Sequence, residues 1–138
     1  MPVISLQKAF IYQRDQLVLS DVNFSIQKEE FVYLIGRTGS GKSSLLQTLY
    51  ADLWLEKGSG IIGGFELHAL KRSEIPYLRR KIGIVFQDFQ LLSDRNIEKN
   101  LHFYLKAMGW KDKNEMNERI AEVLTLVNLP HILEKMPH

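Results

Sequence analysis

One octapeptide dominates this sequence: Gly36-Arg37-Thr38-Gly39-Ser40-Gly41-Lys42-Ser43. It matches the pattern G-x-x-x-x-G-K-[ST] at every fixed position. A continuously apolar segment, Phe31 to Ile35, precedes it, as is typical of a strand buried on both faces. Apolar residues at helical spacing follow it, namely Leu45, Leu46, Leu49 and Leu53. Strand, glycine-rich loop and helix in this order are the context in which the pattern forms a phosphate-binding loop, or P-loop.

The residue types of this loop suit the chemistry of phosphate binding. Glycines at positions 36, 39 and 41 let backbone N–H groups approach phosphate oxygens closely. The helix that starts near Lys42 directs the positive end of its dipole at the anion. Lys42 supplies a positive charge for the β- and γ-phosphates, and the Ser43 hydroxyl can ligate Mg²⁺. The predicted nucleotide-binding residues are Gly36, Arg37, Thr38, Gly39, Ser40, Gly41, Lys42, Ser43 and Ser44.

Composition narrows the classes of partner. The 138 residues suit one domain or part of one, and we treat residues 1–138 as a single unit. The formal net charge of +2 is too small to indicate nucleic acid or an anionic membrane surface as a partner. Cysteine is absent, which excludes disulfides and thiolate metal sites. No apolar run approaches the roughly 20 residues that span a bilayer. Any membrane contact is therefore expected to come through a partner.

The remaining segments predict an α/β fold. Val3–Leu6 and Leu17–Ile26 are rich in branched and aromatic residues and predict strands. Gly58–Leu67 predicts a short hairpin, and Ile82–Phe86 predicts a second buried strand. Ser73 can cap a short helix that runs through Lys81. Two amphipathic helices are expected after that, with apolar faces made by Ile97, Leu101, Leu105 and Met108, and by Met116, Ile120, Val123, Leu124 and Val127. Strands joined by helices favour a parallel α/β core.

A second motif separates the P-loop families. Arg79-Arg80-Lys81-Ile82-Gly83-Ile84-Val85-Phe86-Gln87-Asp88 closely resembles the Q-loop region of ABC ATPases. The resemblance implies a P-loop NTPase fold of the ABC type with an N-terminal antiparallel β-subdomain, and ATP with Mg²⁺ as cofactors. It also implies that Gln87 reaches the metal and the attacking water, and so acts in catalysis beside Lys42. The same glutamine would link the nucleotide site to a membrane partner.

Within that family the chain most resembles the ATPases of bacterial cell division. The resemblance rests on Glu74–Arg80, on Phe86-Gln87-Asp88 and on Leu91–Arg95, where lipoprotein- and macrolide-export relatives usually differ at Asp94-Arg95. It implies an integral membrane subunit as partner, a head-to-tail homodimer and a peripheral location at the cytoplasmic face of the bacterial inner membrane. Because Phe89–Asn100 follows Gln87 directly, we expect it to face the membrane partner.

Two further expectations follow from the resemblance. ABC ATPases stack an aromatic ring on adenine, and the distance back from Gly36 favours Tyr12, with Phe10 as the alternative; either ring could instead fill the core of the β-subdomain. Relatives usually place a glycine in the turn before the P-loop strand, whereas this chain has Lys28-Glu29-Glu30. If that turn needs a positive φ, Glu29 is strained there.

The chain stops at His138, before the position of the signature motif of ABC ATPases, so the sequence predicts a domain truncated before that motif. The Walker B aspartate and the catalytic glutamate of the family would also follow. Two alternatives of other classes stay open: a nucleotide or small-molecule kinase, and a nucleotide-binding fragment that does not hydrolyse ATP. The arginine pair at 79 and 80 fits the ABC pattern better than a kinase lid.

Overall fold

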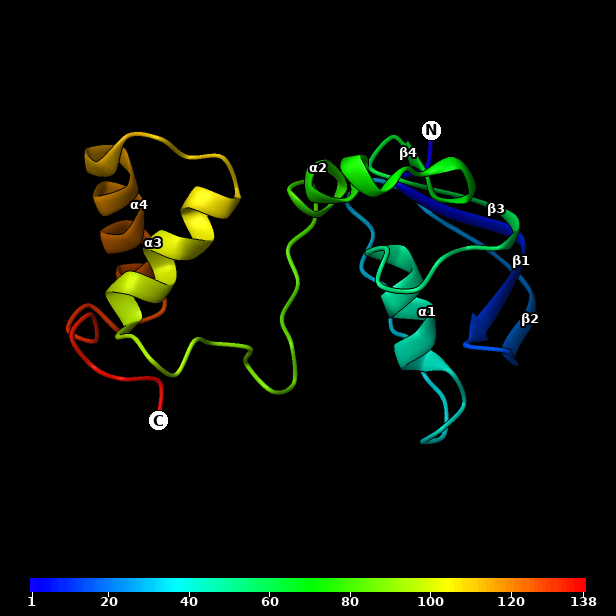
Figure 1. The fold of residues 1–138 in the computed structure, drawn as a ribbon, viewed down its shortest axis with the longest axis horizontal. Helices are drawn as coiled ribbons and strands as arrows, with labels where there is room; N and C mark the ends of the chain where they lie inside the picture. The colour runs from blue at the N-terminus through cyan, green and yellow to red at the C-terminus, as the bar shows by residue number, and fades with distance from the viewer. The chain divides into compact units, whose positions relative to one another are not determined.

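The computed structural model describes all residues from Met1 to His138 and shows two compact units (Figure 1). The first unit contains Met1–Gly83 and the second contains Ile84–His138. The P-loop belongs to the first unit, whereas Gln87 belongs to the second.

An antiparallel sheet forms the framework of the first unit, as the sequence predicts for its N-terminal part. Its strands are β1 (Ile4–Gln13), β2 (Gln16–Ile26), β3 (Lys57–Ile62) and β4 (Phe65–Glu66), in the spatial order β2-β1-β3-β4. β1 and β2 form a hairpin in which Gln13 pairs with Gln16. Gly58 has a φ of 94°, and a Cβ there would lie 2.2 Å from the Lys8 carbonyl oxygen, so the close approach of β3 to β1 requires glycine. The predicted hairpin over 58–67 is therefore present as β3 and β4.

Helix α1 (Lys42–Leu49) packs on this sheet and positions the P-loop (Figure 1). Leu45 on α1 joins a buried core with Leu6 and Ile11 of β1 and Ile62 of β3. Three short helical segments follow the sheet, namely η1 (Leu67–Ala69), η2 (Arg72–Glu74) and α2 (Ile75–Arg79). Leu67, Leu70 and Leu78 from this region are buried in the same core. The helix expected from Ser73 to Lys81 is thus present in shorter form.

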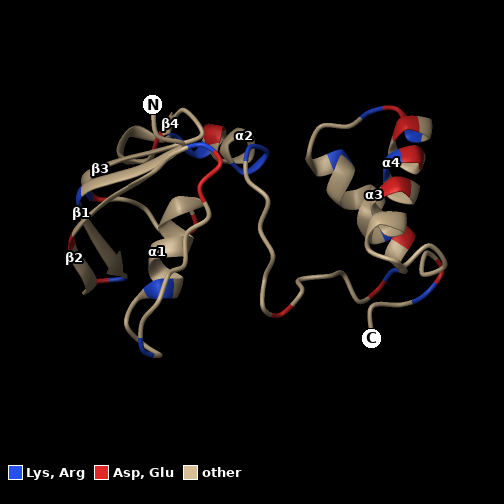
Figure 2. Ribbon diagram, turned by 180° about the vertical axis from the view of Figure 1, so that it is seen from behind, with Lys and Arg blue, Asp and Glu red and all other residues tan.

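Two helices make up most of the second unit. α3 (Ile97–Ala107) begins at Asn96, whose side chain accepts a hydrogen bond from the Lys99 N–H, and α4 (Lys113–Leu126) begins at Asp112, whose side chain accepts one from the Glu115 N–H. On α4, Met116, Ile120 and Leu124 are buried, as the periodicity predicts, and charged residues lie along its exposed side (Figure 2). Val127 ends that predicted face but is exposed.

The two predicted buried strands of a parallel core are not present. Residues 31–35 and 82–86 are irregular and pair with no strand. Phe31 is 81% exposed and Ile35 is 88% exposed, while Val85 is fully exposed. The prediction was wrong at this level because a strand in the middle of a parallel sheet needs hydrogen-bonded neighbours on both sides. No segment among the 138 described residues supplies them.

The turn before residue 31 contains the strain that the sequence predicted. Glu29 has a φ of 69°, in the left-handed region that disfavours a side chain. Its ion pair with Lys28, at 3.7 Å, is more than 80% exposed on both sides and contributes little.

Replacing Glu29 with glycine is expected to raise the free energy of unfolding by about 0.5–1 kcal/mol, because glycine adopts this φ without strain. Urea denaturation measures the change. The neighbouring variant Glu30→Gly is the control, since the Glu30 Oε2 atom accepts a 2.6 Å hydrogen bond from the Gln27 N–H and its loss is destabilising. A stability that falls in both variants would show that position 29 is not strained.

Candidate functional site

The P-loop is a turn that runs directly into α1. The Ser40 N–H donates to the Arg37 carbonyl oxygen at 3.1 Å, which folds the loop back on itself. Gly41 stands at the N-cap of α1 with a φ of 95°, and the Leu45 N–H donates the first helical hydrogen bond to its carbonyl at 2.9 Å. The N-terminal N–H groups of α1 therefore point toward the loop, where an anion is stabilised by them and by the helix dipole.

Three glycines of the loop have different reasons to be glycine. Gly39 and Gly41 have φ angles of 80° and 95°, which other residues rarely adopt. A Cβ on Gly41 would also lie 2.9 Å from side-chain carbons of Val18 and Leu19 on β2. A Cβ on Gly36 would lie 2.7 Å from the Ser40 hydroxyl oxygen. Position 41 thus combines a backbone and a packing requirement, and it holds the loop against the hairpin.

Lys42 holds its charge inside the loop. Its Nζ donates to the carbonyl oxygens of Gly36 at 2.6 Å and Arg37 at 2.7 Å, and lies 3.5 Å from the Ser40 hydroxyl oxygen. It forms no ion pair with any carboxylate. Because no carboxylate of the protein pairs with Lys42, its donors are directed at neutral oxygens that a phosphate group can replace.

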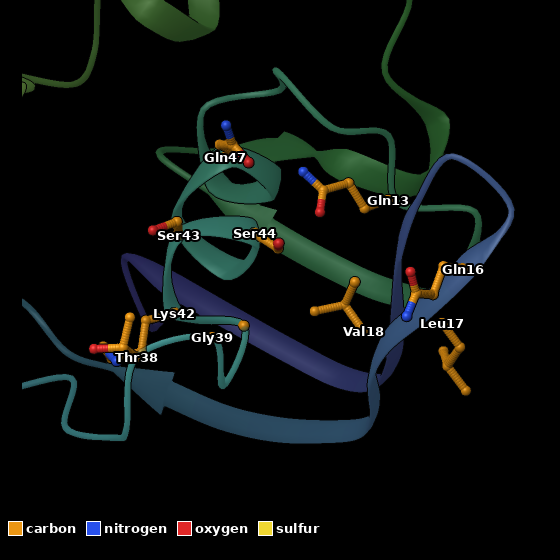
Figure 3. A pocket seen from close by; sticks show the side chains of 11 residues that line it. Gln13, Gln16, Leu17, Val18, Thr38, Gly39, Lys42, Ser43, Ser44 and Gln47 are labelled. Atoms are coloured by element: carbon orange, nitrogen blue, oxygen red, sulfur yellow. The ribbon is translucent and has the colours of Figure 1, made fainter.

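A pocket of about 620 Å³ lies between this loop and the β1–β2 hairpin (Figure 3). Such a volume is in the range of cofactor sites. Six predicted residues line it: Thr38, Gly39, Gly41, Lys42, Ser43 and Ser44. Gly36, Arg37 and Ser40 shape the loop without lining the pocket. The pocket therefore brings together the part of the motif that carries the lysine and the hydroxyl groups.

Sequence reasoning missed the other lining residues, which are Gln13, Gln16, Leu17, Val18 and Gln47. Two signals could have found some of them. Gln13 and Gln16 flank a two-residue turn and pair across it, so they lie on one face of the hairpin. Gln47 lies three and four residues after Ser44 and Ser43, on the same face of α1. Figure 3 shows these amides around the pocket with the serines of α1.

The predicted adenine-stacking ring is not part of the pocket lining. Tyr12 precedes Gln13 on β1 and pairs with Leu17, but it is not among the lining residues. The alternative, Phe10, packs against Lys57, whose Nζ lies 4.2 Å from the ring centroid. The stacking role of Tyr12 stays a prediction.

The donor set of the pocket fits Mg²⁺ in the way that nucleotide sites bind it. Ser43 offers an exposed hydroxyl beside Lys42, and no carboxylate lines the pocket. No group of three or more histidine, aspartate or glutamate side chains is placed to hold a metal by itself. Mg²⁺ commonly takes few protein ligands and completes its shell with phosphate oxygens and water, so one hydroxyl is compatible with a nucleotide-bound ion.

Gln87 lies in the second unit, in a turn with an unusual backbone. The side chain is exposed, and Phe89 and Gln90, which follow it closely, have φ angles of 60° and 48°. Two successive left-handed residues without glycine are strained, and such strain is concentrated at functional segments. The catalytic and metal-binding roles of Gln87 stay predictions.

The segment after this turn is fixed by one buried amide. Asn100 on α3 is 6% exposed, and its Oδ1 accepts from the Leu92 N–H at 2.7 Å. Its Nδ2 donates to the carbonyl oxygens of Leu92, Arg95 and Asn96, each at 3.0 Å. The conformation of residues 92–96 therefore depends on this one side chain.

Asp94 and Arg95 form a bidentate pair on the surface of that segment. The Arg95 Nε and Nη2 atoms each lie 3.0 Å from an oxygen of Asp94, and the guanidinium lies 5.6 Å from the centroid of the Phe103 ring. The hydrogen bond from Arg95 holds the pKa of the Asp94 carboxyl below its usual value. The pair therefore remains charged on both sides near neutral pH.

These features define a P-loop nucleotide-binding domain. The profile of the ABC transporter family matches residues 19–138, so the chain belongs to that family. This finding decides against the kinase alternative. No helix in the chain is both long enough and apolar enough to cross a bilayer.

Several cell-division and transport proteins are similar to the chain. It is 35% identical over 127 residues to the cell division ATP-binding protein FtsE of Streptococcus pneumoniae (strain D39), which covers 92% of this chain and 55% of that protein. It is 38% identical to FtsE of Mycobacterium tuberculosis, over 86% of this chain and 51% of that protein. It is also 39% identical to the methionine import ATP-binding protein MetN 2 of Salmonella typhi, over 80% of this chain and 32% of that protein.

A solved structure shares the fold. The dimeric ATP-binding cassette MJ0796 bound to ADP and Pi superposes with a TM-score of 0.84 at 27% identity, over 97% of this chain and 61% of that one. The neighbour is an ABC cassette, which confirms the ABC-type P-loop fold with its antiparallel β-subdomain. The chain spans about half the length of the FtsE relatives that it matches.

Proposed function

We propose that the chain binds Mg-ATP as part of the ATP-binding subunit of an ABC-type complex similar to FtsE. The observation that supports this most directly is the pocket in which Lys42, Ser43 and the N-terminus of α1 meet the β1–β2 hairpin. Backbone N–H groups of the loop bind the phosphates, and Lys42 offsets the charge of the β- and γ-phosphates. Ser43 would hold Mg²⁺, which neutralises phosphate charge when bound. Tyr12 is the residue proposed to stack on adenine.

Hydrolysis is proposed for the whole protein and not for these 138 residues by themselves. A carboxylate must orient the attacking water in such ATPases, and the pocket has no aspartate or glutamate in its lining. The absence of a carboxylate from the pocket lining favours a second candidate function for the chain, which is nucleotide binding without turnover. Gln87 alone can position a water but cannot accept its proton.

Titration with a fluorescent ATP analogue and a phosphate-release assay test both statements. We expect saturable, Mg²⁺-dependent binding of the ATP analogue. We also expect a rate of phosphate release no higher than that in buffer without protein. Absence of binding by folded chain would contradict the proposed function. Turnover that Lys42→Ala abolishes would show instead that a catalytic carboxylate lies within residues 1–138.

The partner we propose is an FtsX-like integral membrane subunit. The whole protein would then lie at the cytoplasmic face of the bacterial inner membrane as a head-to-tail homodimer and couple ATP to cell division. The similarity to FtsE supports this proposal, and so does the segment Phe89–Asn100, which exposes Phe89, Leu91 and Asp94 and holds Arg95 half-buried beside Asp94. A lipoprotein- or macrolide-export subunit is the alternative within the family.

Reversing the charges of Asp94 and Arg95 one at a time is expected to reduce co-purification with the membrane subunit several-fold, in the full-length protein. Nucleotide affinity should stay within about twofold of the parent, since neither residue lines the ATP pocket. The matched control is Arg119→Glu on α4, which breaks an exposed pair with Glu122 instead. Normal complex formation by both Asp94 and Arg95 variants would contradict the assignment of this surface.

A further inference from the structure

The C-terminal end of α1 has an uncommon closure. Helices often end with glycine in the left-handed conformation, but here Ala51 occupies that conformation with a φ of 58°. The Gln47 carbonyl oxygen accepts from the N–H groups of Asp52 at 2.8 Å and Leu53 at 3.2 Å. The last turn of α1 contains no basic residue to complement the helix dipole.

Arg79 supplies the missing positive charge from another part of the chain. It is the last residue of α2, 29 positions after Tyr50. Its Nε donates to the Tyr50 carbonyl oxygen at 3.0 Å, and its Nη2 donates to the Ala51 carbonyl oxygen at 3.3 Å. Its Nη2 also lies 3.8 Å from the Asp52 carboxylate. The guanidinium therefore binds the carbonyls that close α1 and places a positive charge at the negative end of the helix.

The backbone around Arg79 is held in place by burial and hydrogen bonds. Leu78, the preceding residue, is fully buried in the core that also contains Leu45 of α1. The Arg80 N–H donates to the Pro76 carbonyl oxygen at 3.1 Å, and the Lys81 N–H donates to the Leu78 carbonyl oxygen at 2.9 Å. The backbone that carries Arg79 is therefore held by these hydrogen bonds and by the burial of Leu78.

Because α1 is short, loss of structure at its C-terminal end is expected to disturb its N-terminal end as well. Eight residues are too few for a stable isolated helix, so its conformation depends on how its ends are held. Its first residues are Lys42, Ser43 and Ser44, which line the pocket. Fraying at Tyr50 and Ala51 would therefore loosen the N–H groups and the side chains that are directed at phosphate.

We propose that Arg79 is a positioning residue for the phosphate site. By closing the C-terminal end of α1, it keeps the N-terminal end in the geometry that binds nucleotide phosphates. This inference rests on the proposed function, because it presumes that the pocket binds Mg-ATP.

The variants Arg79→Ala and Arg79→Lys test the proposal, with Arg80→Ala as control. Arg80 is the adjacent arginine and its loss changes the net charge equally, but its guanidinium lies over the ring of Tyr77 on α2, 5.2 Å from the centroid. Titration with Mg-ATP should show affinity weakened about tenfold in Arg79→Ala and about threefold in Arg79→Lys, because lysine keeps the charge and one donor. Arg80→Ala should stay within about twofold of the parent.

Two readouts separate positioning from a general loss of stability. Amide hydrogen exchange should accelerate in residues 42–53 of Arg79→Ala at a temperature where circular dichroism shows the chain folded. Competition with AMP should show a smaller loss of affinity than for ATP, since the β- and γ-phosphates contact the loop at the start of α1. Equal losses for the two nucleotides would overturn the proposal.

The outcomes also distinguish this inference from the proposed function. If the parent chain does not bind Mg-ATP, the proposed function fails and this inference with it. If the unmodified chain binds Mg-ATP and Arg79→Ala binds it equally well, only the proposed role of Arg79 is overturned. Should Arg79→Ala fail to fold, Arg79→Lys decides, and an affinity equal to that of Arg80→Ala would overturn the proposal.

Discussion

Replacing Lys42 with alanine is expected to weaken Mg-ATP binding by about 100-fold. The ammonium group lies inside the loop, 2.6 Å from the Gly36 carbonyl oxygen, and no carboxylate neutralises it. A hydrogen bond to a charged group contributes about 1.5–3 kcal/mol, and 2.7 kcal/mol corresponds to roughly 100-fold in affinity. Titration of the folded variant with a fluorescent ATP analogue measures the loss.

The matched control for Lys42→Ala is Lys28→Ala. Both variants lose one positive charge, but the Lys28 side chain is 83% exposed in a turn and lies outside the pocket. The affinity of Lys28→Ala for Mg-ATP should remain within about twofold of that of the unmodified chain, because an exposed charge outside the pocket is screened by salt. Unchanged affinity in Lys42→Ala would refute the assignment of the phosphate site.

Replacing Gly41 with alanine is expected to lower both stability and nucleotide affinity. The left-handed φ of 95° costs a side chain about 1–2 kcal/mol. The added Cβ would also lie 2.9 Å from side-chain carbons of Val18 and Leu19, so the loop or the hairpin must move. We expect the free energy of unfolding to fall by about 2–3 kcal/mol in urea denaturation. Mg-ATP affinity should fall at least about tenfold, because the N-cap of α1 shifts.

Two other glycines provide a graded comparison for Gly41→Ala. Gly39 has a φ of 80° but no atom within 4 Å of an added Cβ, so Gly39→Ala carries the conformational cost alone. Gly83 has neither a left-handed φ nor a close neighbour, so Gly83→Ala should be neutral. Stability is expected to decrease in the order Gly83→Ala, Gly39→Ala, Gly41→Ala. Equal stability of the Gly39 and Gly41 variants would show that contact with β2 is unimportant.

The local features of this protein were predictable from the sequence. The octapeptide 36–43 predicts the loop, and the apolar spacing after it predicts α1, because glycine conformations and helix periodicity depend on residues close in the chain. For the same reason the sequence predicts the hairpin of β3 and β4 and the buried residues Met116, Ile120 and Leu124 of α4. The strain at Glu29 was expected from the resemblance, because relatives usually place a glycine in this turn and the φ found there suits glycine.

Tertiary structure alone decided the features that depend on distant partners. Residues 31–35 and 82–86 have strand-like sequences but form no strand, because strand formation requires hydrogen-bonded neighbours that local sequence does not reveal. The amides of Gln13, Gln16 and Gln47 reach the pocket only because the hairpin folds against α1. Arg79 closes α1 from 29 residues away. Such contacts arise when the core brings distant segments together, and no periodicity in the sequence encodes them.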